Sequence, residues 1–274
     1  FWKMRKKCWE LYVLVSIPVL LCIVFCYIPM FGNMIAFQDY SVRKGLLGSE
    51  FVGFKYFKQF LKQPIFLDIF KNTIILRIYG LIAGFPIPIL LALAFNELRN
   101  GKRKKILQTI TYAPYFISTV VVVGILRNVF SYHFGIVNEF LKMFGKQPYD
   151  FMGSSACFRS LYVWSGIWQG AGYSAVLYIA ALSGIDASLH EAAIIDGASK
   201  VQRIRYIDLP GIKPTIIITL IMNIGSILNV GFEKVFLMQN SSNYGVSEII
   251  STYVYKVGVK QAQFSYSTAI SLFN

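Results

Sequence analysis

Six apolar runs dominate the chain, and they limit its fold more than any other feature. The runs cover residues 11–35, 69–95, 106–129, 157–182, 215–232 and 264–274. About 20 residues of helix cross the hydrocarbon core of a bilayer, and backbone polar groups there must be hydrogen-bonded inside the protein. We therefore predict an all-α, polytopic membrane helix bundle of six spans, forming one transmembrane domain over residues 1–274. Because the last run breaks off at Asn274, we expect its span to be cut short.

The composition supports a membrane protein and argues against a nucleic-acid-binding protein. Of the 274 residues, 55% are hydrophobic and only 15% are charged, against about 25% charged residues in an ordinary soluble domain. The net charge of +14 is of the kind seen in nucleic-acid-binding proteins, but the basic residues do not gather in a DNA- or RNA-binding motif. We therefore expect membrane lipid around the chain and no nucleic acid as a partner.

The basic residues sort by side of the membrane and predict the orientation of the chain. The N-terminal segment, the loop after the second run and the polar stretch 184–213 hold four, five and four of them. The three opposite loops, 36–68, 131–156 and 233–262, hold five, two and three. Because short loops rich in lysine and arginine stay in the cytoplasm, we expect the N-terminus and the stretch 184–213 on the cytoplasmic side.

The polar stretch 184–213, which separates the fourth and fifth apolar runs, begins with a predicted helix. Ser188 followed three residues later by Glu191 has the spacing of a capping box, so the helix should start at Leu189. Ala192 and Ala193 have small side chains, so the helix is narrow on this side, which suits a helix that lies in the groove of another protein.

The same stretch then turns a corner. Asp196-Gly197 predicts a helix end, because glycine takes the left-handed conformation without steric cost. A second helix is expected from Ser199 and should end before Pro210, since the residue before a proline is pushed out of the helical region. Arg203 lies in this second helix, where it is available to carboxylates or lipid phosphates.

Residues of this stretch also share one longer pattern, formed by Glu191, Ala192, Ala193, Asp196, Gly197, Ala198, Ile207, Leu209, Pro210 and Pro214. The pattern resembles the EAA loop of ABC-importer permeases. In that family the loop is the coupling helix, which docks into a cleft on the cytosolic ATPase. The resemblance implies that these residues, with Arg203 beside them, couple the chain to an ATPase. An ordinary amphipathic loop between two spans is the alternative.

The segments after the fifth run extend the resemblance. Residues 229–240 (NVGFEKVFLMQN) and 248–258 (EIISTYVYKVG) look like the carbohydrate-uptake branch of these permeases. They are most similar to the lipoprotein-associated polysaccharide permease subgroup, relatives of the maltose importer's larger membrane subunit. The resemblance implies a type I importer in a bacterial plasma membrane that moves oligosaccharides by alternating access. It also implies three kinds of partner: a second homologous permease subunit, two copies of a cytoplasmic ABC ATPase, and an extracellular or lipid-anchored sugar-binding protein.

The sequence carries no visible catalytic set, so we do not expect an enzyme. A Walker-type glycine loop, a nucleophile elbow and histidines at ligand spacing are all missing from it. We expect neither a metal nor a cofactor on this chain, because ATP and Mg²⁺ would bind to the partner ATPase. Two alternatives stay open: an importer of the same kind for phosphate, an amino acid or a peptide, and a secondary transporter that acts alone.

Polar side chains inside the apolar runs indicate a substrate path. The candidates are Asn223, Ser226 and Asn229 in the fifth run, Glu233 directly after it, and Trp168, Gln169 and Tyr173 in the fourth run. The first four recur at three- and four-residue steps, which predicts one helix face turned toward a partner helix or a water-filled path. Aromatic rings with amide and hydroxyl groups suit a sugar, whereas contact between helices is the alternative. Arg77 in the second run is expected to pair or to snorkel.

Overall fold

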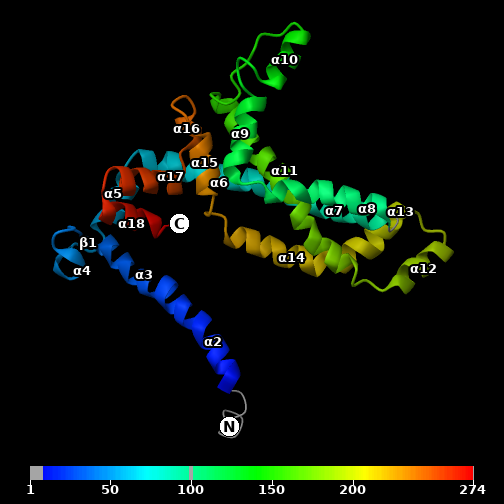
Figure 1. Ribbon diagram of the computed structural model, residues 1–274, viewed down its shortest axis with the longest axis horizontal. Coiled ribbons are helices and arrows are strands. Elements are labelled where there is room, and N and C mark those ends of the chain that lie inside the picture. The colour runs from blue at the N-terminus through cyan, green and yellow to red at the C-terminus, as the bar shows by residue number, and fades with distance from the viewer. Residues whose placement is uncertain (1–8, 99–100, 274) are drawn as a thin grey trace. The chain divides into compact units, whose positions relative to one another are not determined.

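The computed structural model describes residues 9–98 and 101–273, and nearly all of its secondary structure is helical (Figure 1). Within these residues the sheet content is one antiparallel pair of short strands, β1 (Gln38–Asp39) and β2 (Glu50–Phe51). The predicted all-α architecture is confirmed. The chain divides into two compact units, residues 1–66 with 250–274 and residues 67–249.

The first unit begins with a long apolar helix whose hydrogen-bonding type changes along its length. Its parts are α2 (Trp9–Cys22), the π-helical turn η1 (Ile23–Tyr27), α3 (Ile28–Met30) and the 3₁₀ segment η2 (Phe31–Phe37). The other helices are α4 (Gly45–Gly48), α5 (Lys55–Lys62), α17 (Ile250–Tyr255), the π-helical η5 (Lys256–Lys260) and α18 (Phe264–Ser271). Aromatic rings join them: the Phe60 ring of α5 is buried and lies 6.3 Å from that of Tyr266 in α18.

The second unit is organised around its longest helix, α11 (Ser155–Leu182). Before it come α6 (Ile65–Gly84, whose first turn starts in the first unit), α7 (Pro86–Glu97), α8 (Lys102–Tyr112), η3 (Ala113–Phe116), α9 (Thr119–Val129) and α10 (Ile136–Met143). After it come α12 (Ala187–Ile195), α13 (Lys200–Arg203), η4 (Ile204–Asp208), α14 (Leu209–Gly225), α15 (Phe232–Met238) and α16 (Tyr244–Ser247). Helices α7, α8 and α14 all pack on α11.

Two hydrophobic cores hold the second unit together, and α11 contributes to both. One core gathers Leu76 of α6, Val123 of α9 and Val235 of α15 around Phe158, near the start of α11. The other gathers residues of α7 and α14 around Ala175, in the second half of α11. Since Phe158 and Ala175 are both fully buried, α11 links the two cores.

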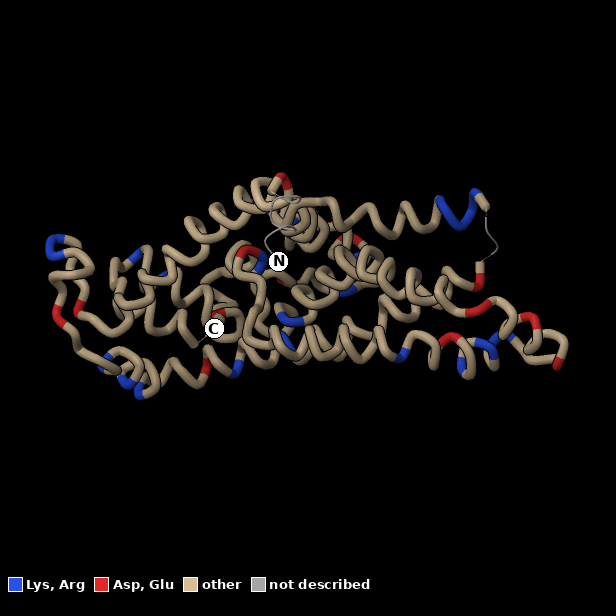
Figure 2. Tube along the Cα trace, turned by 90° about the horizontal axis from the view of Figure 1, so that it is seen from below, with Lys and Arg blue, Asp and Glu red and all other residues tan. Residues whose placement is uncertain are grey.

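Three helices of the described chain are long and apolar enough to cross a membrane: Trp9–Phe37, Ile65–Glu97 and Lys200–Gly225. Two helix pairs meet the same criterion only together, Lys102–Phe116 with Thr119–Val129 and Ser155–Leu182 with Ala187–Ile195. The structure therefore offers three to five spans by length and composition, and the six spans stay a prediction. Figure 2 shows the charged residues gathered mainly in loops and at helix ends, with long uncharged stretches between them.

The apolar run 106–129 is not the single straight span that we expected. Its two helices, α8 and α9, meet at an angle of 99°. Pro114 lies in the 3₁₀ turn after α8, where its missing N–H removes a helical hydrogen bond. Ser118 then acts as the N-cap of α9, its Oγ accepting a hydrogen bond from the Val121 backbone N. Hydropathy alone does not show that one helix ends and a second begins within this run.

The prediction of a helix end before Pro210 is wrong, because the helix is continuous over Lys200–Gly225. The π-helical turn η4 lies directly before Leu209-Pro210, just as η1 lies directly before Ile28-Pro29. A wider turn displaces the carbonyl that a proline ring would otherwise meet one turn back. Both helices therefore pass their proline without ending.

We predict that Gly172 is needed for the close approach of α11 to α8. A Cβ on Gly172 would overlap the backbone carbonyl of Thr111, whereas a Cβ on Gly170 would meet nothing within 4 Å. Small residues of this kind let membrane helices pack closely. Gly172→Ala should cost about 1–3 kcal/mol of stability through overpacking, and Gly170→Ala should not. Thermal unfolding of the purified protein in detergent measures this, and equal melting temperatures for the two variants would contradict it.

Candidate functional site

The helix α12 carries Glu191, Ala192 and Ala193, but it starts before Leu189. Asp186 is its N-cap, and the Asp186 carboxylate accepts a hydrogen bond from the Ser188 backbone N at 3.0 Å. The predicted capping box between Ser188 and Glu191 is therefore wrong, because a good capping acceptor lies two residues earlier. A capping box does form at the start of α13, where Ser199 and Gln202 make both reciprocal hydrogen bonds.

The predicted corner at Asp196-Gly197 is confirmed. Asp196 is the C-cap of α12, and Gly197 has a φ of +75°. The Gly197 backbone N donates to the Ile194 carbonyl at 3.0 Å, and the Ala198 backbone N donates to the Ala193 carbonyl at 2.8 Å. These two bonds form a Schellman motif, which satisfies the last carbonyls of the helix and requires a left-handed residue at the glycine position.

The segment 191–198 forms one exposed helix and turn. Glu191, Ala192 and Asp196 are exposed, and Ala193 and Ala198 are half-buried. The apolar side chains of Ile194 and Ile195 are 57% and 85% exposed. Neighbouring exposed apolar side chains on a polar loop are typical of an interaction surface. The structure thus brings the predicted coupling residues of α12 onto a surface that a partner can reach.

Arg203 turns toward the end of α7. Its Nη2 lies 3.8 Å from Oε2 of Glu97, and Nζ of Lys200 lies 3.9 Å from the same oxygen. The Arg203 side chain is only 15% exposed, so this carboxylate contact belongs to the interior of the chain. Leu209 and Pro210, the other predicted coupling residues, are exposed at the start of α14.

A second contact joins α12 to the helix that follows it. His190 Nε2 lies 3.2 Å from Oδ1 of Asp208, a carboxylate that is 1% exposed at the end of η4. The contact lacks hydrogen-bond geometry, so it acts as an ion pair when the histidine is protonated. The sequence had given no role to His190, because Asp208 becomes its neighbour only when the chain turns at Gly197.

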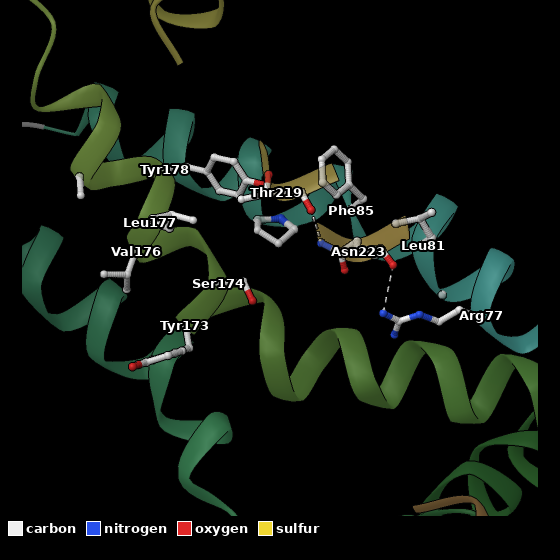
Figure 3. Close-up of a pocket in the computed structure, with 14 residues that line it drawn as sticks. Arg77, Leu81, Phe85, Tyr173, Ser174, Val176, Leu177, Tyr178, Thr219 and Asn223 are labelled. Atoms are coloured by element: carbon white, nitrogen blue, oxygen red, sulfur yellow. Dashed lines mark hydrogen bonds between the residues drawn. The ribbon is translucent and has the colours of Figure 1, made fainter. Parts of the chain in front are cut away.

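A cavity in two adjoining parts is lined by residues of α6, α7, α11 and α14, and its smaller part also by Lys234 of α15. Figure 3 shows the larger part. The parts have volumes of about 600 and about 400 Å³, within the range of ligand-binding pockets. Both are lined by Arg77, Gly80, Gly84, Pro88, Ser174 and Asn223. In Figure 3, Arg77 extends from α6, Tyr173 and Tyr178 belong to α11, and Thr219 and Asn223 belong to α14.

The larger part of the cavity combines aromatic rings with polar groups. The Tyr173 ring stacks on that of Tyr115, with centroids 4.0 Å apart and planes inclined by 7°. The Tyr178 hydroxyl lies 2.9 Å from Oγ1 of Thr219. Nδ2 of Asn223 donates to the Thr219 carbonyl at 2.8 Å, which leaves the oxygen of its amide as an acceptor near the cavity. Flat aromatic faces next to amide and hydroxyl groups suit a ligand with both apolar and hydroxylated surface.

The structure brings some of the predicted path residues together and separates others. Asn223 and Tyr173 line the larger part of the cavity, and Asn223 and Gln169 line the smaller part. Ser226 accepts a hydrogen bond from Arg77 Nη2 at 2.6 Å. Trp168 lines a different groove between α9 and α11, whose walls are mainly apolar.

The expected polar stripe on one face of the fifth span is wrong. Helix α14 ends at Gly225, so Asn229 follows the helix and Glu233 lies on α15. Glycine weakens a helix, and Ser226 Oγ donates to the Asn223 carbonyl at 3.1 Å, a side-chain bond that competes with helical pairing. Neither Asn229 nor Glu233 lines either part of the cavity.

The sequence did not single out the two cations of this cavity as path residues. Arg77 is expected from the sequence to pair or to snorkel, and Lys234 lies in a segment that is predicted to be a loop. In the structure, Lys234 is 9% exposed and its Nζ donates to the Tyr162 carbonyl at 3.1 Å. Burial lowers the pKa of Lys234 to about 8.

Comparisons with known proteins place this geometry among transport proteins. Residues 84–274 match the family described as "Binding-protein-dependent transport system inner membrane component". The chain is 43% identical to the polygalacturonan/rhamnogalacturonan transport system permease protein YteP of Bacillus subtilis (strain 168), over 96% of this chain and 82% of that protein. It is 42% identical to protein LplB of the same organism, over 98% of this chain and 85% of that protein.

A similar fold is found in a crystal structure of a bacterial ABC transporter involved in the import of the acidic polysaccharide alginate. The match has a TM-score of 0.91 and 37% sequence identity, and it covers 100% of this chain and 92% of that one.

We predict that the buried Lys234 makes stability depend on pH. The lysine loses its proton near pH 8 in the folded state and near pH 10.5 when solvated. Between these values the unfolded chain binds more protons, so the folded state gains stability as pH rises, by on the order of 3 kcal/mol. Melting temperatures measured from pH 7.5 to about 10 should rise relative to those of Lys234→Met. Parallel pH profiles for the two proteins would contradict this.

Proposed function

Because the chain belongs to the family of binding-protein-dependent transport system inner membrane components, we propose that it is the permease subunit of an ATP-driven importer of oligosaccharides. The observation that carries this proposal is the match over the whole chain to a transporter that imports a polysaccharide. The polysaccharide named in the description of YteP supports the same class of cargo. The cavity between α6, α7, α11 and α14 supplies a path for that cargo.

The segment 191–198 is the site at which an ATPase subunit engages the permease in this proposal. Ile194 and Ile195 are exposed and would place apolar side chains in a groove of the ATPase subunit. The exposed carboxylate of Glu191 would anchor the helix to that subunit through its charge. Gly197 sets the corner between the end of α12 and the start of α13. Closure of two ATPase subunits would then displace α12 as a short rigid element, because both its ends are capped.

Two contacts connect α12 and the stretch after it to helices that line the cavity: the Arg203–Glu97 ion pair, and the His190–Asp208 contact, which is an ion pair when the histidine is protonated. His190 joins α12 to Asp208 at the base of α14, and Arg203 joins the same stretch to Glu97 at the end of α7. Helices α14 and α7 contribute Asn223 and Pro88 to the cavity wall. A movement of the loop therefore shifts two of the helices between which the cargo would pass, which is what alternating access requires.

The proposed assembly has further components. A second homologous permease would complete the path, two copies of a cytoplasmic ATPase would engage the two coupling helices, and an external or lipid-anchored binding protein would deliver the sugar. ATP and Mg²⁺ would bind to the ATPase. The distribution of basic residues supports an N-terminus on the cytoplasmic side of the inner membrane, which is also where the segment 191–198 would meet its ATPase.

We predict that proteoliposomes holding the complete importer accumulate a labelled oligosaccharide only with both ATP and the loaded binding protein. The physical reason is that the permease itself supplies a path and no energy source. Filter-binding uptake assays measure this. Uptake by this chain alone, driven by an ion gradient, would overturn the proposal in favour of a secondary transporter. ATP-driven uptake of phosphate, an amino acid or a peptide in place of the oligosaccharide would overturn the cargo class.

We predict that Gly197→Asp uncouples ATP hydrolysis from uptake. Aspartate at this position takes a left-handed conformation at a cost of about 1–2 kcal/mol and places a negative charge at the C-terminus of α12. Gly197→Asn is the matched control, since asparagine tolerates this conformation and carries no charge. The ratio of sugar imported to ATP hydrolysed should fall toward zero in Gly197→Asp and be largely kept in Gly197→Asn. An unchanged ratio in both variants would show that the corner has no part in coupling.

A further inference from the structure

The smaller part of the cavity is positively charged. Its lining includes two cationic side chains, Arg77 and Lys234, and no aspartate or glutamate lines either part among the described residues. A cation held between apolar helices without a counter-charge is costly. Such groups are kept where they meet a ligand or mark a transport path.

The Lys234 ammonium has more N–H donors than it uses in hydrogen bonds to the described chain. Its Nζ makes one hydrogen bond, to the Tyr162 carbonyl, and lies 5.3 Å from the centroid of the Tyr162 ring. An ammonium carries three N–H donors. A Cβ on Gly166 would lie 3.3 Å from this Nζ, so the glycine keeps space open beside the charge. Within the described chain Lys234 is engaged in no ion pair.

Arg77 is held in place and likewise keeps free donors. Its Nη2 donates to Ser226 Oγ at 2.6 Å and reaches the Asn223 carbonyl at 3.5 Å. Its Nε is buried and has no hydrogen-bond partner in the described part of the chain. A guanidinium has five N–H donors in a planar fork, which fits the two oxygens of a carboxylate. The hydrogen bond to Ser226 thus holds the Arg77 guanidinium in place and leaves its other N–H groups available to a ligand.

We propose that Arg77 and Lys234 bind carboxylate groups of the cargo, so that this permease is selective for oligosaccharides built from uronic acids. The inference rests on the proposed function, because it assigns a cargo to the same cavity. Each uronic acid carries one carboxylate for the cations and an apolar ring face for Tyr173, which lines the larger part of the cavity. Asn223 and Gln169 supply amides for the hydroxyl groups. Neutral sugars would leave the two cations without a counter-charge.

The test compares two trisaccharides in the complete importer reconstituted in proteoliposomes. One is tri-galacturonate, and the other is the same trisaccharide with its carboxyl groups reduced to alcohols. Both are supplied at concentrations that saturate the binding protein, so that the ratio of their uptake rates reports on the permease. The wild type should prefer tri-galacturonate. Arg77→Gln and Lys234→Gln should each lower the preference about tenfold, the factor expected for loss of a charge-assisted hydrogen bond, while uptake of the neutral trisaccharide continues.

Matched variants separate recognition from structural support. Arg77→Lys and Lys234→Arg keep the charge and should retain most of the preference. Arg127→Gln removes an arginine that also donates to a backbone carbonyl, that of Leu237, but lines neither part of the cavity, and it should leave the preference unchanged. Equal loss of uptake for both trisaccharides in Arg77→Gln and Lys234→Gln, or a wild type without preference, overturns the inference and leaves the importer intact. A wild type that imports neither trisaccharide but imports another oligosaccharide overturns the inference alone, whereas one that imports no oligosaccharide with ATP and the loaded binding protein overturns the proposed function as well.

Discussion

Backbone hydrogen bonds of a membrane protein have to be made within the protein, and this requirement shapes the chain at several of its prolines. In a bilayer no water replaces a bond that a proline removes. The chain meets this need with π-helical turns before Pro29 and Pro210 and with a 3₁₀ turn and a serine cap around Pro114. Where α6 gives way to α7, Gly84 and Pro88 line the cavity. At the boundary between α6 and α7, the break in the helix therefore lies beside the cavity.

The stretch from α12 to η4 is connected to the helices that line the cavity through a small number of polar contacts. His190 and Asp208 connect α12 to α14, and Glu97 connects the end of α7 to Arg203. Partly exposed contacts of this kind add little net stability, but they connect the elements that they join, and the His190 contact is an ion pair only when the histidine is protonated. In this structure they join the exposed helix to two helices that carry cavity residues. In the proposed function, a displacement of α12 would therefore be passed on to α7 and α14.

Much of the fold could be predicted from the sequence because its determinants are local. The apolar runs predicted the helical architecture, and Asp196-Gly197 predicted a corner that depends only on glycine conformation. The errors concern helix ends, which depend on the residues next to them. Asp186 caps α12 in place of Ser188, and a π-helical turn lets the helix continue past Pro210. Helix α14 ends at Gly225, before Asn229. Lys234 could not be found at all, because its partner Tyr162 lies on a helix distant in sequence. The periodicity of apolar residues in the sequence identifies helix faces, but it does not show which lysine or arginine lines a cavity.

The measurement that tests the account most directly is purification of the full-length protein from its native membrane, followed by identification and quantification of the proteins that accompany it. The account predicts a second permease with its own EAA loop in equal amount and an ABC ATPase in two copies, attached through the segment 191–198. A protein that purifies alone or as a homodimer, stable without any ATPase, would contradict the assignment as an importer permease.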